Sequence, residues 1–184
     1  MRPRARDTYR HGNLRAEAVE AALALVEADG HAALSLRKVA EASGVAHRSL
    51  YNHFADREAL LDAVAEVGFH QLAIPLQAAD SRQAYVAAYA RFALANPRLK
   101  ALMDSRPHAT MKHRPSLQAA VHLGIAEALR LFGRPDRSSA DNRRAVMKVL
   151  YLLHGGLALH SGGILDLADD EALIGELQAM IGDG

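Results

Sequence analysis

Apolar side chains recur along this chain at intervals of three and four residues, the spacing of one face of an α-helix. In residues 13–29 this stripe consists of Leu14, Ala18, Ala21, Ala22, Leu25 and Val26, and Gly30 follows where such a helix would end. The periodicity continues to the C-terminal end, and no segment shows the alternation typical of a strand. The pattern therefore predicts an all-α protein of about nine helices.

Capping residues and helix breakers set the expected bounds. Ser35 can cap a short helix over residues 36–43, Gly44 ends it, and a second short helix covers residues 46–53. Asp56 caps a long helix to residue 79, in which Pro75 predicts a kink. The remaining predicted helices cover residues 82–95, 98–104, 115–132, 139–161 and 169–181.

Composition narrows the class of protein. The chain has 184 residues, half of them hydrophobic, and no cysteine, which excludes disulfides and thiolate metal sites and fits a reducing compartment. We see no run of about 18 apolar residues and no apolar leader, so we expect a cytoplasmic protein without membrane association. Charge is uneven: residues 1–15 carry five Arg and one Asp, whereas residues 151–184 carry six acidic residues and no Lys or Arg. The basic N-terminal end suits a polyanion.

The most informative segment covers residues 34–54. Two helices of about eight residues can share a core only if they cross steeply, which requires a small contact residue and a tight turn. Ala40 supplies the contact, Gly44 the turn, and Val39, Val45 and Leu50 the shared apolar wedge. This pattern is typical of a helix-turn-helix whose second helix enters the major groove of DNA.

The surface left on the second helix is compatible with DNA. With Val45 and Leu50 facing inward, no remaining position carries a carboxylate. Imidazole, guanidinium, hydroxyl, phenol and amide groups can all reach base edges or phosphate oxygens. The exposed set is predicted to be Ala46, His47, Arg48, Ser49, Tyr51, Asn52 and His53.

Residues 34–61 resemble the DNA-binding signature of the tetracycline-repressor (TetR) family. The likeness is strongest in the Leu50-Tyr-Asn-His-Phe54 core, which is followed by a charged stretch and a Leu-Leu pair, and it extends back to the lead-in at residues 9–14. The resemblance implies an N-terminal three-helix helix-turn-helix domain at residues 1–56, with a disordered basic arm at 1–10. It also implies a C-terminal helical ligand-binding and dimerisation domain at residues 57–184.

The family's roles carry over position by position. Ser35 would cap the helix and touch a phosphate, Arg37 would reach a base, and Lys38 is either a phosphate contact or a solvated surface residue. His47, Arg48 and Ser49 would contact bases or phosphates, and Tyr51, His53 and Arg57 match phosphate-contacting positions. Tyr51 could instead pack on the first helix of the chain. His53 could instead cap the C-terminal carbonyls of its own helix, the predicted recognition helix at residues 46–53.

The C-terminal part carries two further predictions. Small residues within bulky helices suggest a four-helix dimer interface, although packing within one chain is the alternative. The predicted interface residues are Leu152, Gly155, Gly156, Leu159, Leu173, Leu177 and Ile181. An effector pocket, expected to take a largely hydrophobic small molecule, is assigned to Phe69, His70, Tyr85, Tyr89, Phe92, Met103, His122, Tyr151 and His154.

These observations predict a homodimeric transcriptional repressor that binds a palindromic DNA operator and is released by a small hydrophobic effector. We expect no enzyme activity, because no GxSxG, Walker A, HExxH or GxGxxG motif is present. We also expect no cofactor and no metal site. The alternative is a helical protein-interaction module whose helix-turn-helix does not read DNA.

Overall fold

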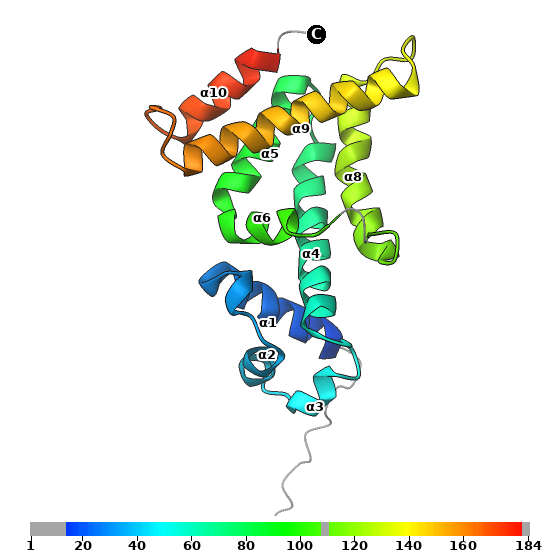
Figure 1. The fold of residues 1–184 in the computed structure, drawn as a ribbon, viewed down its shortest axis with the longest axis vertical. Coiled ribbons are helices and arrows are strands. Elements are labelled where there is room, and N and C mark those ends of the chain that lie inside the picture. Colours follow the sequence, from blue (N-terminus) through cyan, green and yellow to red (C-terminus); the bar gives the residue numbers. More distant parts are fainter. Residues whose placement is uncertain (1–13, 108–110, 182–184) are drawn as a thin grey trace, which may run out of the picture. The chain divides into compact units, whose positions relative to one another are not determined.

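The computed structural model of the chain describes residues 14–107 and 111–181. Within these ranges it holds nine α-helices, one short 3-10 helix and no strand (Figure 1), which confirms the all-α prediction. The predicted basic arm at residues 1–10 lies outside the described residues. The helices are α1 Leu14–Asp29, α2 Leu36–Ser43, α3 His47–Leu50, α4 Arg57–Gln77, α5 Arg82–Ala95, α6 Pro97–Asp104, α8 Pro115–Phe132, α9 Ser139–Ser161 and α10 Asp170–Ile181, with the 3-10 helix at His31–Ala33.

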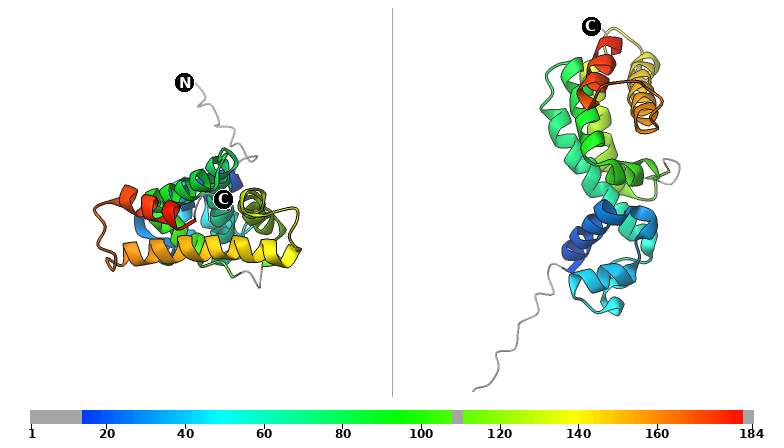
Figure 2. Two further views of the ribbon diagram at one scale, coloured as in Figure 1. Left: turned by 90° about the horizontal axis from the view of Figure 1, so that it is seen from above. Right: turned by 90° about the vertical axis from the view of Figure 1, so that its left-hand side faces the viewer.

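The chain divides into two compact units, Met1–Val64 and Ala65–Gly184. The boundary falls inside α4, eight residues after the predicted division between residues 56 and 57. The roles predicted for the two parts, DNA binding and then ligand binding with dimerisation, stay predictions. In the first unit, α2 packs on α1 and α3. In the second, α9 runs along one edge and packs on α5, α8 and α10 (Figure 2).

Side-chain caps begin the helices where the sequence indicated. The Ser35 hydroxyl accepts a hydrogen bond from the Lys38 backbone N–H at 3.2 Å and so caps α2. An Asp56 carboxylate oxygen accepts the Ala59 N–H at 2.8 Å and caps α4. Each cap satisfies a backbone donor that the first helical turn leaves without a partner, which is why these bounds could be read from the sequence.

The second helix of the motif is shorter than predicted. It ends at Leu50, and residues Tyr51 to His53 form a turn. The backbone N–H groups of Asn52 and His53 donate to the carbonyls three residues earlier, at 3.3 and 2.9 Å. Such i to i−3 bonds tighten the last turn and end the α-helical ladder. The predicted helix over residues 46–53 is therefore wrong at its C-terminal end.

The apolar wedge of the motif lies where it was expected. Val39 and Leu50 are fully buried and Ala40 is 4% exposed, whereas Val45 is half-buried. Phe54 closes the same core with 2% exposure. These contacts hold two short helices that could not bury a face alone.

Gly44 makes the turn between α2 and α3 with φ of 68° and ψ of 21°, the left-handed region. Its backbone N–H donates to the carbonyls of Ala40 and Glu41 and so ends α2. A Cβ added here meets no atom within 4 Å, so strain in the backbone is the only penalty. We expect Gly44→Ala to lower the free energy of unfolding by about 1 kcal/mol, measured by urea denaturation. A Gly175→Ala variant, also in open space but within the helix α10, is the control and should not destabilise the chain.

The apolar stripe of α10 packs against helices of its own unit. Leu173 and Leu177 of α10 are 1% and 2% exposed. A Cβ added to Gly156 on α9 would lie 2.7 Å from Leu177 Cδ2, so glycine permits this close approach. Both leucines were predicted at a dimer interface. That assignment is wrong, because their stripe completes the core against α5 and α9.

Among the described helices, α4 alone is long and apolar enough to cross a membrane, with a mean hydropathy of 1.2 over its most apolar window. Of that window, 56% is buried inside the fold. Burial accounts for its apolar character, since a core helix must also present apolar side chains to its neighbours.

Candidate nucleic-acid interface and ligand cavity

The predicted DNA-reading surface is exposed and free of acidic side chains. All seven predicted positions of the second helix lie on it, and six are exposed while Ser49 is half-buried. The His47 and Tyr51 rings meet edge to face, with centroids 5.2 Å apart. Tyr51 is 51% exposed and so does not pack into the core beside α1. Because these side chains are already exposed to solvent, they can contact base edges and phosphates of DNA without unfolding any part of the core.

Two basic residues on α2 flank this surface. Arg37 Nε lies 3.3 Å from a Glu41 carboxylate oxygen, and Lys38 Nζ lies 3.9 Å from Asp29. The Arg37 side chain is 79% exposed. Exposed ion pairs contribute little, so both cations can turn toward a phosphate. Ser35 accepts in its cap, but its hydroxyl proton remains able to donate.

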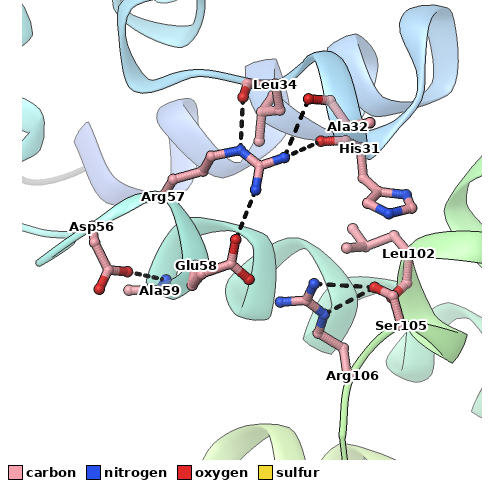
Figure 3. A network of polar contacts seen from close by, with 10 residues as sticks. All are labelled: His31, Ala32, Leu34, Asp56, Arg57, Glu58, Ala59, Leu102, Ser105 and Arg106. Atoms are coloured by element: carbon pink, nitrogen blue, oxygen red, sulfur yellow. Dashed lines mark hydrogen bonds and ion pairs between the residues drawn. The ribbon is translucent and has the colours of Figure 1, made fainter.

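Arg57 makes contacts within the first unit that the sequence did not predict. Its Nε donates to the Leu34 carbonyl at 2.9 Å, and its Nη2 donates to the carbonyls of His31 at 2.6 Å and Ala32 at 3.4 Å (Figure 3). Its Nη1 bonds Glu58 at 2.7 Å. The guanidinium is thus committed to the segment before α2, whose carbonyls it holds against the start of α4. Arg57 therefore braces this segment, and its predicted phosphate contact stays a prediction.

The second unit contains a cavity of about 300 Å³, called here the central cavity. Of the nine residues predicted for an effector pocket, it is lined by Phe69, Tyr85, Tyr89, Met103 and His154. The other four lie elsewhere: His70, His122 and Tyr151 are exposed and Phe92 is half-buried away from the cavity wall. The rest of the wall is Leu72, Leu76, Lys100, Asp104, Arg106, Met111, Val121, Gly124, Ile125, Ala128 and Leu150.

Four polar side chains gather on this otherwise apolar wall. Lys100 Nζ contacts the two Asp104 carboxylate oxygens at 2.7 and 2.6 Å and lies 5.6 Å from the centre of the Tyr89 ring. His154 Nε2 lies 3.4 Å from Asp104 Oδ1 and 3.3 Å from the Tyr89 hydroxyl oxygen. The four groups come from α5, α6 and α9, so only the folded chain brings them together.

Ionisation in this cluster follows from its surroundings. Burial opposes the charged form of Asp104, but hydrogen bonds from His154 and Lys100 outweigh it, and the pKa of Asp104 lies below its ordinary value. Burial, with the Asp104 charge adding to it, raises the pKa of Tyr89. Burial and then Glu127 raise the pKa of Tyr85 to about 12. Asp104 is therefore a carboxylate at neutral pH, and both phenols keep their protons as hydrogen-bond donors.

The charged members of the cavity wall were not predicted from the sequence. Lys100 and Arg106 are each 8% exposed, although charged residues in a short helix and its end normally lie on the surface. The one local signal was the Lys100–Asp104 spacing of four, which pairs side chains on one helical face. The cavity wall is mainly apolar but includes charged groups that the prediction lacked. Within the described residues, no group of three or more His, Asp or Glu side chains is arranged to hold a metal ion.

The first unit has the features of a helix-turn-helix DNA-binding protein: a capped α2, a left-handed glycine turn and an exposed α3 without carboxylates. These features define the class of the protein as a helix-turn-helix DNA-binding protein. Comparison with known proteins gives the family.

A sequence model described as "Bacterial regulatory proteins, tetR family" matches residues 18–64. Tetracycline repressor protein class A from transposon 1721 of Escherichia coli is 31% identical over 157 residues, which cover 82% of this chain and 68% of that repressor. A protein with unknown function from Rhodococcus sp. RHA1 superposes with a TM-score of 0.76 at 31% identity, over 96% of this chain and 97% of the other. A TetR transcriptional regulator from Legionella pneumophila shares the fold, with a TM-score of 0.60 at 18% identity over 92% and 95% of the two chains. The chain belongs to the tetR family of bacterial regulatory proteins and is a transcriptional regulator.

Proposed function

We propose that the protein is a homodimeric repressor whose two recognition helices bind the half-sites of a palindromic operator. A small molecule in the central cavity releases it. The observation that carries the proposal is the exposed, carboxylate-free α3 held behind the Gly44 turn. Repression is favoured by the name of the Escherichia coli relative, a tetracycline repressor. Operator binding would place the protein in the cytoplasm, beside the DNA.

The proposed DNA contacts divide into two kinds. Base edges would be read from α3, with Arg48 able to form two hydrogen bonds to a guanine. Phosphates would be held by the residues that flank it, which fix the register on the duplex. The proposed set is Ser35, Arg37, Lys38, Ala46, His47, Arg48, Ser49, Tyr51, Asn52 and His53.

We assign the dimer interface to the outer face of α9 and the neighbouring part of α10. Tyr151 and Leu159 lie on this face of α9 with Gly155 between them, at spacings of four, and are 68% and 42% exposed. Ile164 and Met180, 70% and 65% exposed, extend the patch beyond α9. An apolar patch of this kind marks an interaction surface, and a second copy can cover it symmetrically. A Cβ added at Gly155 would meet no atom within 4 Å, so another helix can approach closely there.

Leu159→Glu tests this interface. A two-fold axis would bury two added carboxylates without partners, so we expect association to weaken on the order of a hundredfold. Sedimentation equilibrium would follow the shift toward the 19.9 kDa monomer. Leu129→Glu on α8 is the matched control, because Leu129 has the same 42% exposure. Dissociation of that control, with Leu159→Glu still dimeric, would move the interface to α8.

The proposed release mechanism is a shift in the separation of the two recognition helices. They must lie about 34–36 Å apart to enter successive major grooves. The central cavity is walled by α4, α5, α6, α8 and α9, so a ligand there can favour one arrangement of these helices. A preference of about 1–3 kcal/mol for the state that does not bind DNA is enough to change operator occupancy.

Selection of bound duplexes from random DNA tests the proposal as a whole. We expect a palindromic motif, and a steep fall of affinity with salt because several phosphates are contacted in each half-site. The selected operator then serves to screen for molecules that release it. Failure to enrich any motif, both alone and with cell extract added, would overturn the DNA-reading role.

A further inference from the structure

The central cavity presents one cation and one hydroxyl on an apolar wall. Lys100 is 8% exposed, and its ammonium is held between the Tyr89 ring and the Asp104 carboxylate. Asp104 neutralises that ammonium. A ligand anion that takes Lys100 must therefore displace Asp104, whose side chain is half-exposed, and this carboxylate then favours a new positively charged partner.

His154 is placed to become that partner. Its Nδ1 lies 2.8 Å from the Leu150 carbonyl oxygen. A carbonyl only accepts, so Nδ1 carries a proton, and in the neutral ring Nε2 is an acceptor for the Tyr89 hydroxyl at 3.3 Å. A second proton, on Nε2, turns it into a donor toward Asp104 Oδ1 at 3.4 Å. The same proton frees the Tyr89 hydroxyl to donate to a ligand.

We propose that the central cavity binds a molecule with an apolar body and one carboxylate, and that His154 takes up one proton from solvent as the ligand binds. The carboxylate accepts from Lys100 and Tyr89, while protonated His154 replaces Lys100 as the partner of Asp104. One negative charge and one positive charge enter together, so the net charge of the site does not change. The inference rests on the proposed effector role of this cavity and names its ligand class.

The other groups facing the cavity leave this balance intact. From α5, Tyr85 and Tyr89 keep their protons at neutral pH, because burial raises the pKa of each phenol. After α6, the Arg106 guanidinium lines the wall and donates to the Ser105 hydroxyl at 3.2 and 3.0 Å (Figure 3). The cavity residues of α4 and α8 are uncharged. Because Arg106 has partners of its own, the charge balance of the site rests on Lys100, Asp104 and His154.

Isothermal titration of the free protein with octanoate, octanol and octylamine tests the ligand class. These probes share one apolar chain and differ in the head group. We expect octanoate to bind at least tenfold more tightly than either of the others near pH 6. If octanoate binds no more tightly than octanol, including binding by neither, the inference is overturned. Preference for octylamine would also overturn it and assign Asp104 as the ligand's partner.

The proton is tested by pH and by buffer. Octanoate stays ionised from about pH 6 to 8, so its own titration contributes nothing. Binding raises the affinity of His154 for a proton, so octanoate affinity should be full at low pH and fall by up to about tenfold per unit as pH rises. Titrations in two buffers of different ionisation enthalpy should report uptake of up to one proton. Release of a proton, or none exchanged across this range, contradicts the mechanism.

Two variants and one control locate the proton. His154→Gln should abolish the pH dependence, whereas His122→Gln, on α8 and outside the cavity wall, should retain it. Asp104→Asn removes the charge that competes for Lys100, so octanoate should bind more tightly and without proton uptake. Circular dichroism and thermal unfolding would verify that each variant is folded. Unchanged pH dependence in His154→Gln would assign the proton to another group and overturn the inference.

Operator release is measured separately. Octanoate that binds with proton uptake but leaves operator affinity unchanged would support the ligand class and count against the effector role. An operator released only by uncharged molecules would support the effector role and overturn the ligand class. The two proposals therefore fail on different measurements.

Discussion

Arg48→Glu is expected to abolish specific DNA binding while leaving the fold and the dimer intact. Arg48 is exposed at the second position of α3, and no ion pair or hydrogen bond with another side chain in the described residues holds it. Loss of a bidentate arginine contact costs about 1–3 kcal/mol in each half-site. The new carboxylate adds repulsion from phosphate. Across both half-sites we expect operator affinity to fall at least about a hundredfold, measured by fluorescence anisotropy at fixed salt.

The control for Arg48→Glu makes the same change of charge away from α3. Lys112 is exposed in the second unit, so Lys112→Glu lowers the net charge equally without touching the proposed interface. We expect its operator affinity to change by less than about threefold, because screening weakens distant charges. Equal losses in both variants would mean that net charge, not a contact from α3, governs binding. If Arg48→Glu bound the operator with full affinity, α3 would not be the helix that enters the major groove.

Arg57→Ala is expected to lower the free energy of unfolding of the first unit. We expect its effect on the salt dependence of operator binding to be small. The substitution leaves the carbonyls of His31, Ala32 and Leu34 without their charged donor (Figure 3). Hydrogen bonds to charged groups contribute about 1.5–3 kcal/mol, and water replaces part of this at a half-buried site. We expect a loss of about 2–3 kcal/mol in the free energy of unfolding, followed by thermal denaturation and by hydrogen exchange at Leu34.

Two comparisons separate the brace from a phosphate contact. Arg57→Lys keeps the positive charge but loses the planar fork, so its stability should fall between those of the native protein and Arg57→Ala. Arg48→Ala, at an exposed position, should leave stability unchanged. If Arg57→Ala instead keeps full stability and lowers the salt dependence of operator binding by about one counterion, Arg57 contacts phosphate after all.

Local chemistry explains why so much of the fold was predictable. Four helices have the predicted bounds, Leu36–Ser43, Arg82–Ala95, Pro115–Phe132 and Ser139–Ser161. Each ends at a residue whose backbone or capping preference acts within one turn of chain, as Gly44 does after α2 and Gly133 after α8. The error at the end of α3 is also confined to one turn of chain. The sequence pattern of residues Tyr51 to His53 favours a helix, but hydrogen bonds from residue i to residue i−3 form a turn there.

The family signature also lies in contiguous sequence. Residues 34–61 contain the turn, the wedge and the exposed α3, because a helix-turn-helix is built from neighbouring residues. The placement of its exposed side chains could therefore be predicted. Which of them contact DNA is still a prediction.

The sequence alone determined the helical class, the caps, the glycine turn and the family, since these depend on residues close together in the chain. Only the tertiary structure decided the roles of side chains whose partners are distant. Arg57 bonds a carbonyl 23 residues away, Tyr89 meets His154 across 65 residues, and Leu177 packs on Gly156 of another helix. The periodic pattern states that such residues share a face. It does not state which element packs against that face. That contact determines whether an arginine braces the fold or binds a phosphate, and whether a leucine lies in a core or at an interface.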